Sequence, residues 1–414
     1  MSFAPAPEPH PHERVRVVVT GLGPVSSIGV GKDPFCRSLR AGRSGVSPIA
    51  SFDTEGFPHV HGGEVKVFEP ASILRGIAPE DWGRSSLFAA SAARLAVDDA
   101  GLAPGAVAPD RVGVIMGTTC GETQVMEQMT AQLLEGGPEA MAPRLARQVE
   151  AGRLAHAASA EIGAEGESWT VATACAASNY ALSFAYDSLV SGAADVVVSG
   201  GAESVCRFVH AGFYRLGVLA KHACSPFDRE RAGILTAEGG AALVLERLDD
   251  ARARGARPYA ELLGYGLNCD AHHMVAAEHA SIADCMRIAH RHAGVAPTEV
   301  DYISAHGTGT PGNDLAESTA VREVFGERMP PVSSIKSMIG HAMGAASGFG
   351  AIASVLAIRD GFFPPTMNWT TPDPALHGID PVPNAARPAR VRIVQNNGFG
   401  FGGNNAIVML GALA

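Results

Sequence analysis

The chain has 414 residues, of which 46% are hydrophobic and 18% charged, and its formal net charge is −10. This size provides for a large buried core or for two fused halves. No basic block or arginine stripe indicates a nucleic-acid partner, and no apolar run reaches the length of a membrane span. The composition therefore predicts a cytoplasmic globular protein that binds neither nucleic acid nor membrane.

The predicted elements follow an N-terminal tail, residues 1–13, which is Pro-rich, lacks an apolar signal segment and is expected to be disordered. Beyond the tail, short β-branched runs alternate with helical patterns, which is typical of an α/β fold. The pattern restarts after residues 251–258, which predicts two halves, 14–255 and 256–414. The predicted strands are 14–23, 111–119, 194–201, 240–248, 260–267, 300–310, 331–336 and 406–410.

Each half contains one long helix of small residues, which starts near Cys175 in the first half and near His341 in the second. Neither helix has a polar face, and a helix without a polar face is normally buried. We therefore expect two central helices, one from each half, and interpret them as weak evidence of an internal duplication.

Cys175 lies in TACAAS, where the first of these helices begins. Unpaired N–H groups and the positive end of the helix dipole favour a thiolate there, and they can stabilise an oxyanion formed from a thioester. The alternative is a small core residue, because most free cysteines are packed inside proteins. The seven cysteines are odd in number and include no C-x-x-C pair, which argues against a disulfide framework and a metal site.

Two histidines and a lysine are the candidates of the second half. His306 follows the strand pattern DYIS, a position where α/β enzymes place functional residues; a histidine that caps a turn is the alternative. His341 lies at a predicted helix start, where the dipole keeps an imidazole neutral. Lys336, one of four lysines, is expected at a strand end, and a surface lysine with a buried stem is its alternative.

The glycine-rich run NNGFGFGGNN (396–405) precedes a predicted strand. A dinucleotide loop is followed by a helix instead, so the run does not indicate nucleotide binding. Glycines that permit a close approach of the backbone to a ligand explain it better.

Four motifs together resemble the elongating β-ketoacyl-acyl-carrier-protein synthases, a family with the thiolase fold. They are TACAAS, AHGTGTPGND, SSIKSMIGHAMGAAS and NGFGFGGNN, and they occur in order along almost the whole chain. The resemblance implies an α/β protein with duplicated halves in stacked α-β-α-β-α layers. It also implies a decarboxylative Claisen condensation of a malonyl carrier with an acyl group held on Cys175.

The resemblance assigns roles to the matching positions. Cys175 would be the nucleophile, and its N–H with that of Phe401 would form the oxyanion hole. His306 and His341 would bind the malonyl thioester and promote its decarboxylation, and Lys336 would hold the catalytic groups in place. The further implied residues are Phe399 beside Phe401 at the gate, Thr308 and Thr310 on the phosphopantetheine arm, Asp314 and Glu317 behind the site, and Cys120 and Ile234 on the acyl pocket.

Several positions depart from the family pattern. Gly350 stands where the family has a glutamate, and Ala232, Gly233 and Ile234 replace an Asp-Gly-Phe loop. The departures favour a ketosynthase of a type II polyketide pathway, including one for polyenes. The alternatives are a housekeeping fatty-acid synthase, a ketosynthase-like subunit that acts mainly by interaction, and an acyltransferase or thioesterase that never decarboxylates.

The implied partners are acyl carrier proteins, in acyl and malonyl forms, and a second subunit. That subunit is either a second copy of the chain or a chain-length-factor-like protein. Lys66 is a candidate for the carrier-docking surface. No metal or cofactor is expected besides the phosphopantetheine arm of the carrier.

Overall fold

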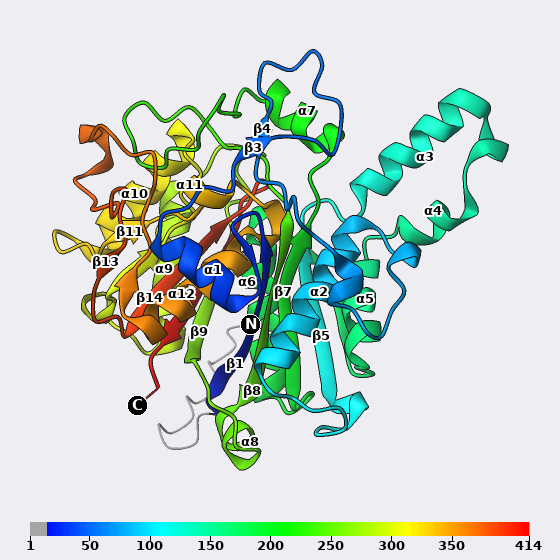
Figure 1. Cartoon of the computed structure of the whole chain (residues 1–414). Helices are drawn as coiled ribbons and strands as arrows, with labels where there is room; N and C mark the ends of the chain where they lie inside the picture. The colour runs from blue at the N-terminus through cyan, green and yellow to red at the C-terminus, as the bar shows by residue number, and fades with distance from the viewer. Residues whose placement is uncertain (1–14, 414) are drawn as a thin grey trace, which may run out of the picture.

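A computed structural model describes residues 15–413 (Figure 1), and the predicted tail at 1–13 lies outside the described residues. Its main sheet has the spatial order β11-β10-β14-β15-β9-β1-β8-β7-β5-β6, with β2 beside β1. The strands of the N-terminal half are β1 (Val17–Ser26), β2 (Gly29–Val30), β5 (Val112–Thr118), β6 (Ser168–Ala172), β7 (Val196–Glu203) and β8 (Gly239–Arg247). Those of the C-terminal half are β9 (Ala260–Cys269), β10 (Tyr302–Ser304), β11 (Val332–Ser333), β14 (Ile393–Phe399) and β15 (Asn404–Gly411).

The two halves of this sheet repeat one arrangement, β1-β8-β7-β5-β6 in the first and β9-β15-β14-β10-β11 in the second. In each half, the first three strands of this order pair antiparallel to one another. The fourth strand pairs parallel to the third, and the fifth pairs parallel to the fourth. The halves meet where residues 17–19 pair with residues 260–262. The equivalence confirms the predicted duplicated α/β architecture, whereas the exact boundary at 255/256 stays a prediction.

Helices cover both outer faces of the halves (Figure 1). α2 (Arg84–Asp99) lies against β1, β8 and β7, with α5 (Arg153–Ile162) beside it on β5 and β6. On the other outer face, α9 (His279–Ala293) lies against β9 and β15, and α10 (Pro311–Phe325) packs on α9. Apolar side chains on one stripe of each helix are buried against the sheet, which is why these helices stay in place.

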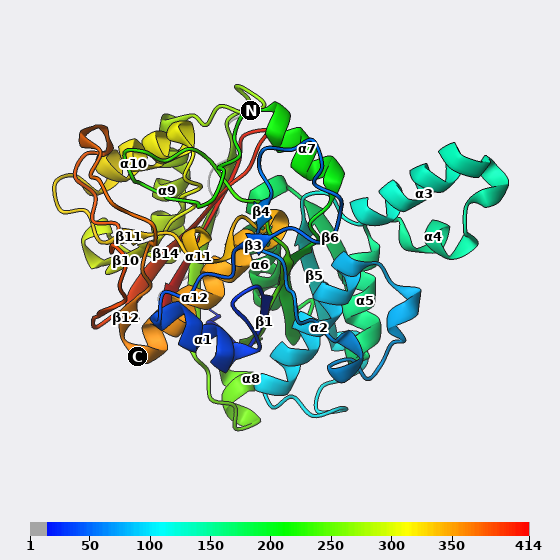
Figure 2. The same cartoon turned by 45° about the horizontal axis from the view of Figure 1, so that its top comes forward.

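Two further helices fill the space between the halves, α6 (Ala177–Val190) and α12 (Ala346–Asp360) (Figure 2). They contact each other and strands of both halves. Every residue of α12 from Ala346 to Ala357 is buried, as its lack of a polar face predicts. These central helices complete the α-β-α-β-α stack.

The two central helices begin in the same unusual way. A 3₁₀ turn precedes each, η5 (Ala174–Ala176) before α6 and η7 (Met343–Ala345) before α12. The first residue of each turn has a positive φ, 49° at Ala174 and 45° at Met343, a conformation that non-glycine residues rarely adopt. The repeated turn strengthens the evidence of duplication, and it pairs Cys175 in the first half with Gly344 in the second.

A helical arm, residues 123–148, stands away from the body in both views (Figures 1 and 2). It consists of α3 (Thr123–Gly136), a turn and α4 (Pro143–Gln148). Three large apolar side chains on α3 are exposed, Met126 by 50%, Leu133 by 41% and Leu134 by 81%.

The remaining helices are α1 (Lys32–Arg40), α7 (Arg207–Arg215), α8 (Leu248–Ala253) and α11 (Lys336–Ile339). Two small sheets pair β3 (Ser47–Pro48) with β4 (His61–Gly62) and β12 (Phe362–Phe363) with β13 (Arg387–Pro388).

Most predicted strands overlap strands of the structure, but two predictions were too long. The strand predicted at 300–310 ends at Ser304, because Gly307 and Gly309 have φ values of 39° and 74° and turn the chain into a loop. The strand predicted at 331–336 covers only Val332–Ser333, so Lys336 starts α11 instead of ending a strand. β6 and β14 were not predicted as strands.

No helix within residues 15–413 is long and apolar enough to span a bilayer.

Candidate active site

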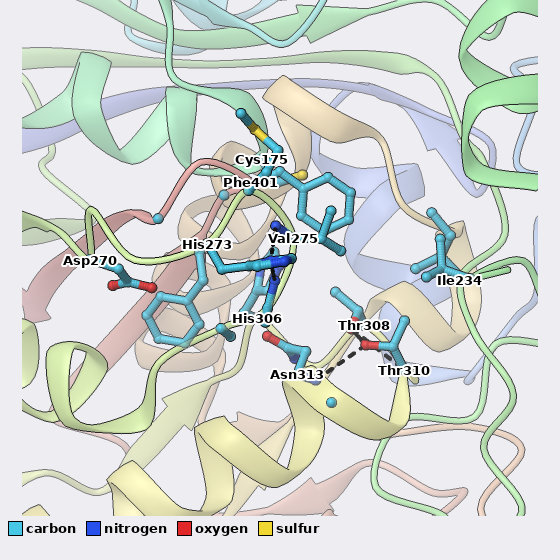
Figure 3. Close-up of a pocket in the computed structure, with 18 of the residues that line it drawn as sticks. Cys175, Ile234, Asp270, His273, Val275, His306, Thr308, Thr310, Asn313 and Phe401 are labelled. Atoms are coloured by element: carbon cyan, nitrogen blue, oxygen red, sulfur yellow. Dashed lines mark hydrogen bonds between the residues drawn. The ribbon is translucent and has the colours of Figure 1, made fainter. Parts of the chain in front are cut away.

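A cavity of about 300 Å³ lies at the point where the two halves bring their turns together (Figure 3). Its walls come from both halves, because β6 leads to Cys175 while β10 and β14 lead to His306 and Phe399. Eight of the predicted site residues line it: Cys175, Ile234, His306, Thr308, Thr310, His341, Phe399 and Phe401. Most of the positions that the motifs singled out therefore meet in one place.

Cys175 occupies the strained turn between β6 and α6 and is 5% exposed. The glycine-rich run passes directly behind this turn: a Cβ on Gly400 would come within 2.9 Å of the carbonyl oxygen of Thr173. This close approach requires glycine, and it brings the main-chain N–H of Phe401 to the sulfur of Cys175. The main-chain N–H of Cys175 itself contacts the same sulfur. The two donors predicted for an oxyanion hole thus converge on the candidate nucleophile.

The electrostatics of Cys175 differ from the expectation of a thiolate. Burial raises the pKa of its thiol to about 12, while the charge of Lys336 and the two N–H groups act in the opposite direction. Burial prevails because a fully buried anion loses its hydration and the helix end replaces only part of it. Burial thus outweighs the helix start, which favours the thiolate, and the candidate nucleophile rests as a thiol.

His306 and His341 face the same cavity as a pair, with ring centroids 5.6 Å apart and exposures of 4% and 2%. Burial, followed by the charge of Lys336, holds the pKa of each well below the usual range, so both rings are neutral. Nδ1 of His341 accepts from the N–H of Met343 at 3.0 Å, which leaves the proton on Nε2. His341 lies five residues before α12 and not at its first turn, so this hydrogen bond and burial, instead of the helix dipole, keep it neutral.

Two buried charged groups hold the main chain of His306. Lys336, only 4% exposed, donates its ammonium to the carbonyl oxygen of His306. Glu317, fully buried, accepts from the N–H groups of His306 at 2.8 Å and Gly307 at 2.7 Å. The alternative of Lys336 as a surface lysine was therefore wrong. Lys336 and Glu317 lie behind the cavity wall and are not among the residues that line it.

The HGTGT loop is organised by Asp314, whose carboxylate accepts from the N–H of Phe227 at 2.8 Å and of Gly309 at 3.2 Å. Burial raises its pKa to about 6. The hydroxyls of Thr308 and Thr310 are 2.8 Å apart and line the cavity together (Figure 3). The loop thus presents two hydroxyl groups to any ligand that enters.

One side of the cavity was missed by sequence reasoning. It is the segment 270–277, of which Asp270, His273 and Met274 line the cavity. The segment contacts the glycine-rich run, because the N–H of Gly402 donates to the carbonyl oxygen of Met274 at 2.8 Å. No motif marks these residues, although two adjacent histidines after a strand were an available signal. Phe213, Asn313 and Asn405 also line the cavity without having been predicted.

The departures from the family pattern are accommodated in different ways. Gly350 leaves room for an amide, because a Cβ there would lie 2.4 Å from Oδ1 of Asn396. Ile234 lines the cavity and packs with Met343. Cys120 is close enough to Cys175 for a charge on Cys175 to raise its pKa. It does not line the cavity, so its place on an acyl pocket stays a prediction. Lys66 is engaged by Glu64 and by the carbonyl oxygen of Pro48 (2.8 Å).

This arrangement suits acyl transfer followed by carbanion chemistry. A thiol, two N–H donors and two neutral imidazoles surround one buried space. The N–H donors can stabilise the oxyanion formed by attack on a thioester, and neutral imidazoles can donate to an enolate oxygen.

Comparison with known proteins gives the same picture. Two family models match the chain: Beta-ketoacyl synthase, N-terminal domain, over residues 14–251, and Beta-ketoacyl synthase, C-terminal domain, over residues 259–370. The 3-oxoacyl-[acyl-carrier-protein] synthase 2 of Synechocystis sp. is 36% identical over 94% of this chain and 96% of its own length. The chloroplastic 3-oxoacyl-[acyl-carrier-protein] synthase I of Hordeum vulgare is 35% identical over 95% of this chain and 88% of its own.

Solved structures are similar over nearly the whole chain. The ishigamide ketosynthase/chain length factor shares 49% identity at a TM-score of 0.95, covering 97% of this chain and 100% of the chain matched. AntDE:AntF, a type II PKS acyl-carrier protein in complex with its ketosynthase bound to the hexaketide, shares 32% identity at a TM-score of 0.90 with the same coverage.

Proposed function

The chain belongs to the β-ketoacyl synthase family and is a β-ketoacyl-acyl-carrier-protein synthase, and on that premise we propose how its residues act and in which pathway. The reaction joins an acyl group on Cys175 to the two-carbon unit of a malonyl carrier, with loss of CO2. The observation that carries the proposal is the meeting of a buried thiol with two neutral imidazoles in one cavity.

In the first step, Sγ of Cys175 attacks the thioester carbonyl of the acyl carrier. The oxyanion accepts from the N–H groups of Cys175 and Phe401. The thiol proton passes to one of the two neutral imidazoles, and from there to the departing thiolate of the phosphopantetheine arm. The acyl chain is then held as a thioester on Cys175, and both histidines are neutral again.

In the second step, the malonyl thioester loses CO2 and its C–C bonding electrons form an enolate. N–H groups of His306 and His341 donate to the enolate oxygen, which stabilises the charge as it develops. The enolate carbon attacks the acyl thioester, a new C–C bond forms and the C–S bond to Cys175 breaks. The departing thiolate of Cys175 takes up one proton from solvent, which restores the thiol. The product is a β-ketoacyl carrier two carbons longer.

The remaining predicted residues act by holding this machinery. Thr308 and Thr310 hydrogen-bond the phosphopantetheine arm, Lys336 and Glu317 hold His306 from behind, and Asp314 holds the loop that carries the threonines. Phe401, with Phe399 beside it, gates the acyl chain. No other cofactor is part of the proposal.

The pathway we propose is type II polyketide biosynthesis, with a polyene chain as one form of it. The 49% identity to the ishigamide ketosynthase/chain length factor supports this over a housekeeping fatty-acid role. Ile234 and Cys120 would shape the acyl pocket, and Ile234→Phe should narrow it. Competition between saturated and unsaturated acyl carriers of matched length tests the pathway: equal or better use of saturated chains contradicts it.

The partners we propose are an acyl carrier protein and a chain-length-factor-like subunit. The exposed apolar side chains of the helical arm, with Leu134 81% exposed, support a second subunit that covers them. A homodimer is the alternative, and light scattering of the chain expressed with and without its partner distinguishes the two. Lys66 stays a candidate for carrier docking. Seven free cysteines fit a reducing compartment, so the proposal places the enzyme in the cytoplasm.

Intact-mass measurement tests the activity. The protein is mixed with an acyl-loaded carrier and then with a malonyl carrier, beside a Cys175→Ala control. An acyl adduct on the wild type alone, followed by CO2 and a carrier product two carbons longer, supports the proposal. An adduct and its transfer without CO2 would support the acyltransferase alternative, and no adduct at any chain length would show that the isolated chain lacks the activity.

A further inference from the structure

Two buried amide side chains join the two segments that carry the predicted oxyanion donors. Asn179 lies in the first turn of α6, four residues after Cys175, and Asn396 lies on β14, five residues before Phe401. The two residues are 0% and 1% exposed. Nδ2 of Asn396 donates to Oδ1 of Asn179 at 2.9 Å. We call this pair the amide clamp.

Main-chain oxygens fix the orientation of both amides. Nδ2 of Asn179 faces the carbonyl oxygens of Asn396 at 3.1 Å and Ala406 at 2.9 Å. Nδ2 of Asn396 faces the carbonyl oxygen of Ser347 at 2.9 Å. A carbonyl oxygen only accepts, so each Nδ2 must be the donor and neither amide can be turned over. The amide clamp therefore holds β14 and β15 against α6 in one defined position.

The two donors of the predicted oxyanion hole come from different halves of the chain. Cys175 belongs to the turn before α6, whereas Phe401 follows β14 in the glycine-rich run. The hole therefore keeps its shape only while α6 and the hairpin of β14 and β15 stay in place. Among the described residues, the hydrogen bonds between the first two turns of α6 and this hairpin are those of Asn179 with Asn396 and Ala406.

Close packing connects the amide clamp with the glycine-rich run. A Cβ on Gly398 would come within 3.2 Å of Nδ2 of Asn179 and within 3.3 Å of Cα of Ala176. Two residues later, Gly400 approaches the carbonyl oxygen of Thr173, in the turn that carries the nucleophile. A displacement of β14 along α6 would therefore displace the run as well.

Direction is what the amide clamp contributes. Apolar side chains could fill the same space, and the hydrogen bonds of buried amides largely offset the cost of removing them from water. Each hydrogen bond, however, requires one distance and one angle. We propose that Asn179 and Asn396 are positioning residues that set the main-chain N–H of Phe401 against the sulfur of Cys175. Their part in catalysis rests on the function proposed above, whereas the geometry that they impose does not.

The glycine at position 350 supports this assignment. Gly350 lies on α12, where alanine is the stronger helix former. A Cβ there would nevertheless lie 2.4 Å from Oδ1 of Asn396, while the next nearest side-chain oxygen, Oγ of Ser304, is 3.2 Å away. Glycine thus leaves the space that the amide clamp occupies, which explains one of the departures from the family pattern.

Crystal structures of the wild type and of two variants test the geometry, whether or not the protein condenses any substrate. Asn179→Leu removes three hydrogen bonds of the amide clamp. Gly350→Ala displaces the amide of Asn396 while favouring the helix, so it serves even if the leucine variant does not fold. In both we expect the main-chain nitrogen of Phe401 to move by about 0.5 Å or more from its place beside Cys175. An unchanged position would overturn the proposal.

Kinetics separate positioning from a merely structural role. The rate at which an acyl carrier forms the adduct on Cys175 should fall at least about tenfold in Asn179→Leu and Gly350→Ala, because the oxyanion of that step depends on the N–H of Phe401. CO2 release from a malonyl carrier, measured without an acyl group, should keep the wild-type rate, because other groups hold the two histidines.

Gly212→Ala is the matched control for these rates. Gly212 is also a helix glycine, in α7, and no atom lies within 4 Å of a Cβ there. The control should keep both rates and the wild-type position of Phe401. An unchanged rate of adduct formation in Gly350→Ala, or an equal loss of both rates, would overturn the positioning role.

Discussion

Replacement of Lys336 by methionine is the sharpest test of how the site is held. Methionine keeps the length of the side chain and removes its charge. The ammonium is 4% exposed and donates to the carbonyl oxygen of His306, while fully buried Glu317 holds the N–H of the same residue. Lys336→Met would thus leave a buried carboxylate without its cation and the main chain of His306 with one anchor instead of two.

The magnitude follows from this burial. Lys336 and Glu317 interact through their charges without a direct ion pair, so the loss is that of a buried hydrogen bond from a charged group, about 1.5–3 kcal/mol of unfolding free energy. Lys336 is too deeply buried for solvent to screen the effect. Displacement of a catalytic ring by about 1 Å lowers a rate by roughly 10²-fold. We expect both effects together, and the pKa of Glu317, which burial already raises, to rise further without the opposing charge of Lys336.

Urea unfolding and CO2 release from a malonyl carrier measure the two quantities. Lys221→Met is the control, because Lys221 is exposed and a surface substitution of this kind changes the unfolding free energy by about 0.5 kcal/mol or less. The reasoning is refuted if Lys336→Met loses less than the control in stability, or if it releases CO2 at the wild-type rate.

Two further predictions concern the turns of the duplicated halves. The rate at which iodoacetamide alkylates Cys175 should rise about tenfold for each pH unit up to pH 9, without a plateau, because burial raises the pKa of the thiol to about 12. Mass spectrometry measures this rate, with Cys175→Ser as the control. A plateau of the rate near pH 7 would contradict the prediction. Gly344→Ala should destabilise the fold by about 1–3 kcal/mol or more, since a Cβ would lie 2.4 Å from Cα of Thr118. Thermal unfolding measures this change, with Gly312→Ala as the control, because no atom lies within 4 Å of a Cβ there.

Local pattern was sufficient for the parts of the fold that depend on burial alone. Strands such as β7 and β8 are almost wholly buried runs of apolar and small residues, and α12 lacks a polar face, so each could be identified from its residues. β14 was missed because four of its seven residues, QNNG, are amides and a glycine, which are unusual in a buried strand. Their burial is explained by partners far away in the sequence, such as His290 and Glu317.

The candidate site was predictable where a motif carries it and not elsewhere. The positions of Cys175 and His306 follow from motifs, and both line the cavity. The segment 270–277 carries no motif and follows β9, whose pairing with β15 brings it beside the glycine-rich run and the cavity. The protonation state of Cys175 could not be foreseen either, since sequence reveals a helix start but not the depth at which it is buried.

The charges of the site follow one principle. The groups proposed to meet the substrate, the thiol of Cys175 and the imidazoles of His306 and His341, are all neutral at rest, whereas Lys336 and Glu317 lie behind them. A cation on the cavity wall would bind the malonyl carboxylate tightly before reaction and so hinder its loss as CO2. Neutral N–H donors interact weakly with the bound substrate and strongly with the enolate and oxyanion that form later. Burial of the charged pair one layer back therefore holds the geometry without stabilising the ground state, which is the requirement for a decarboxylating site.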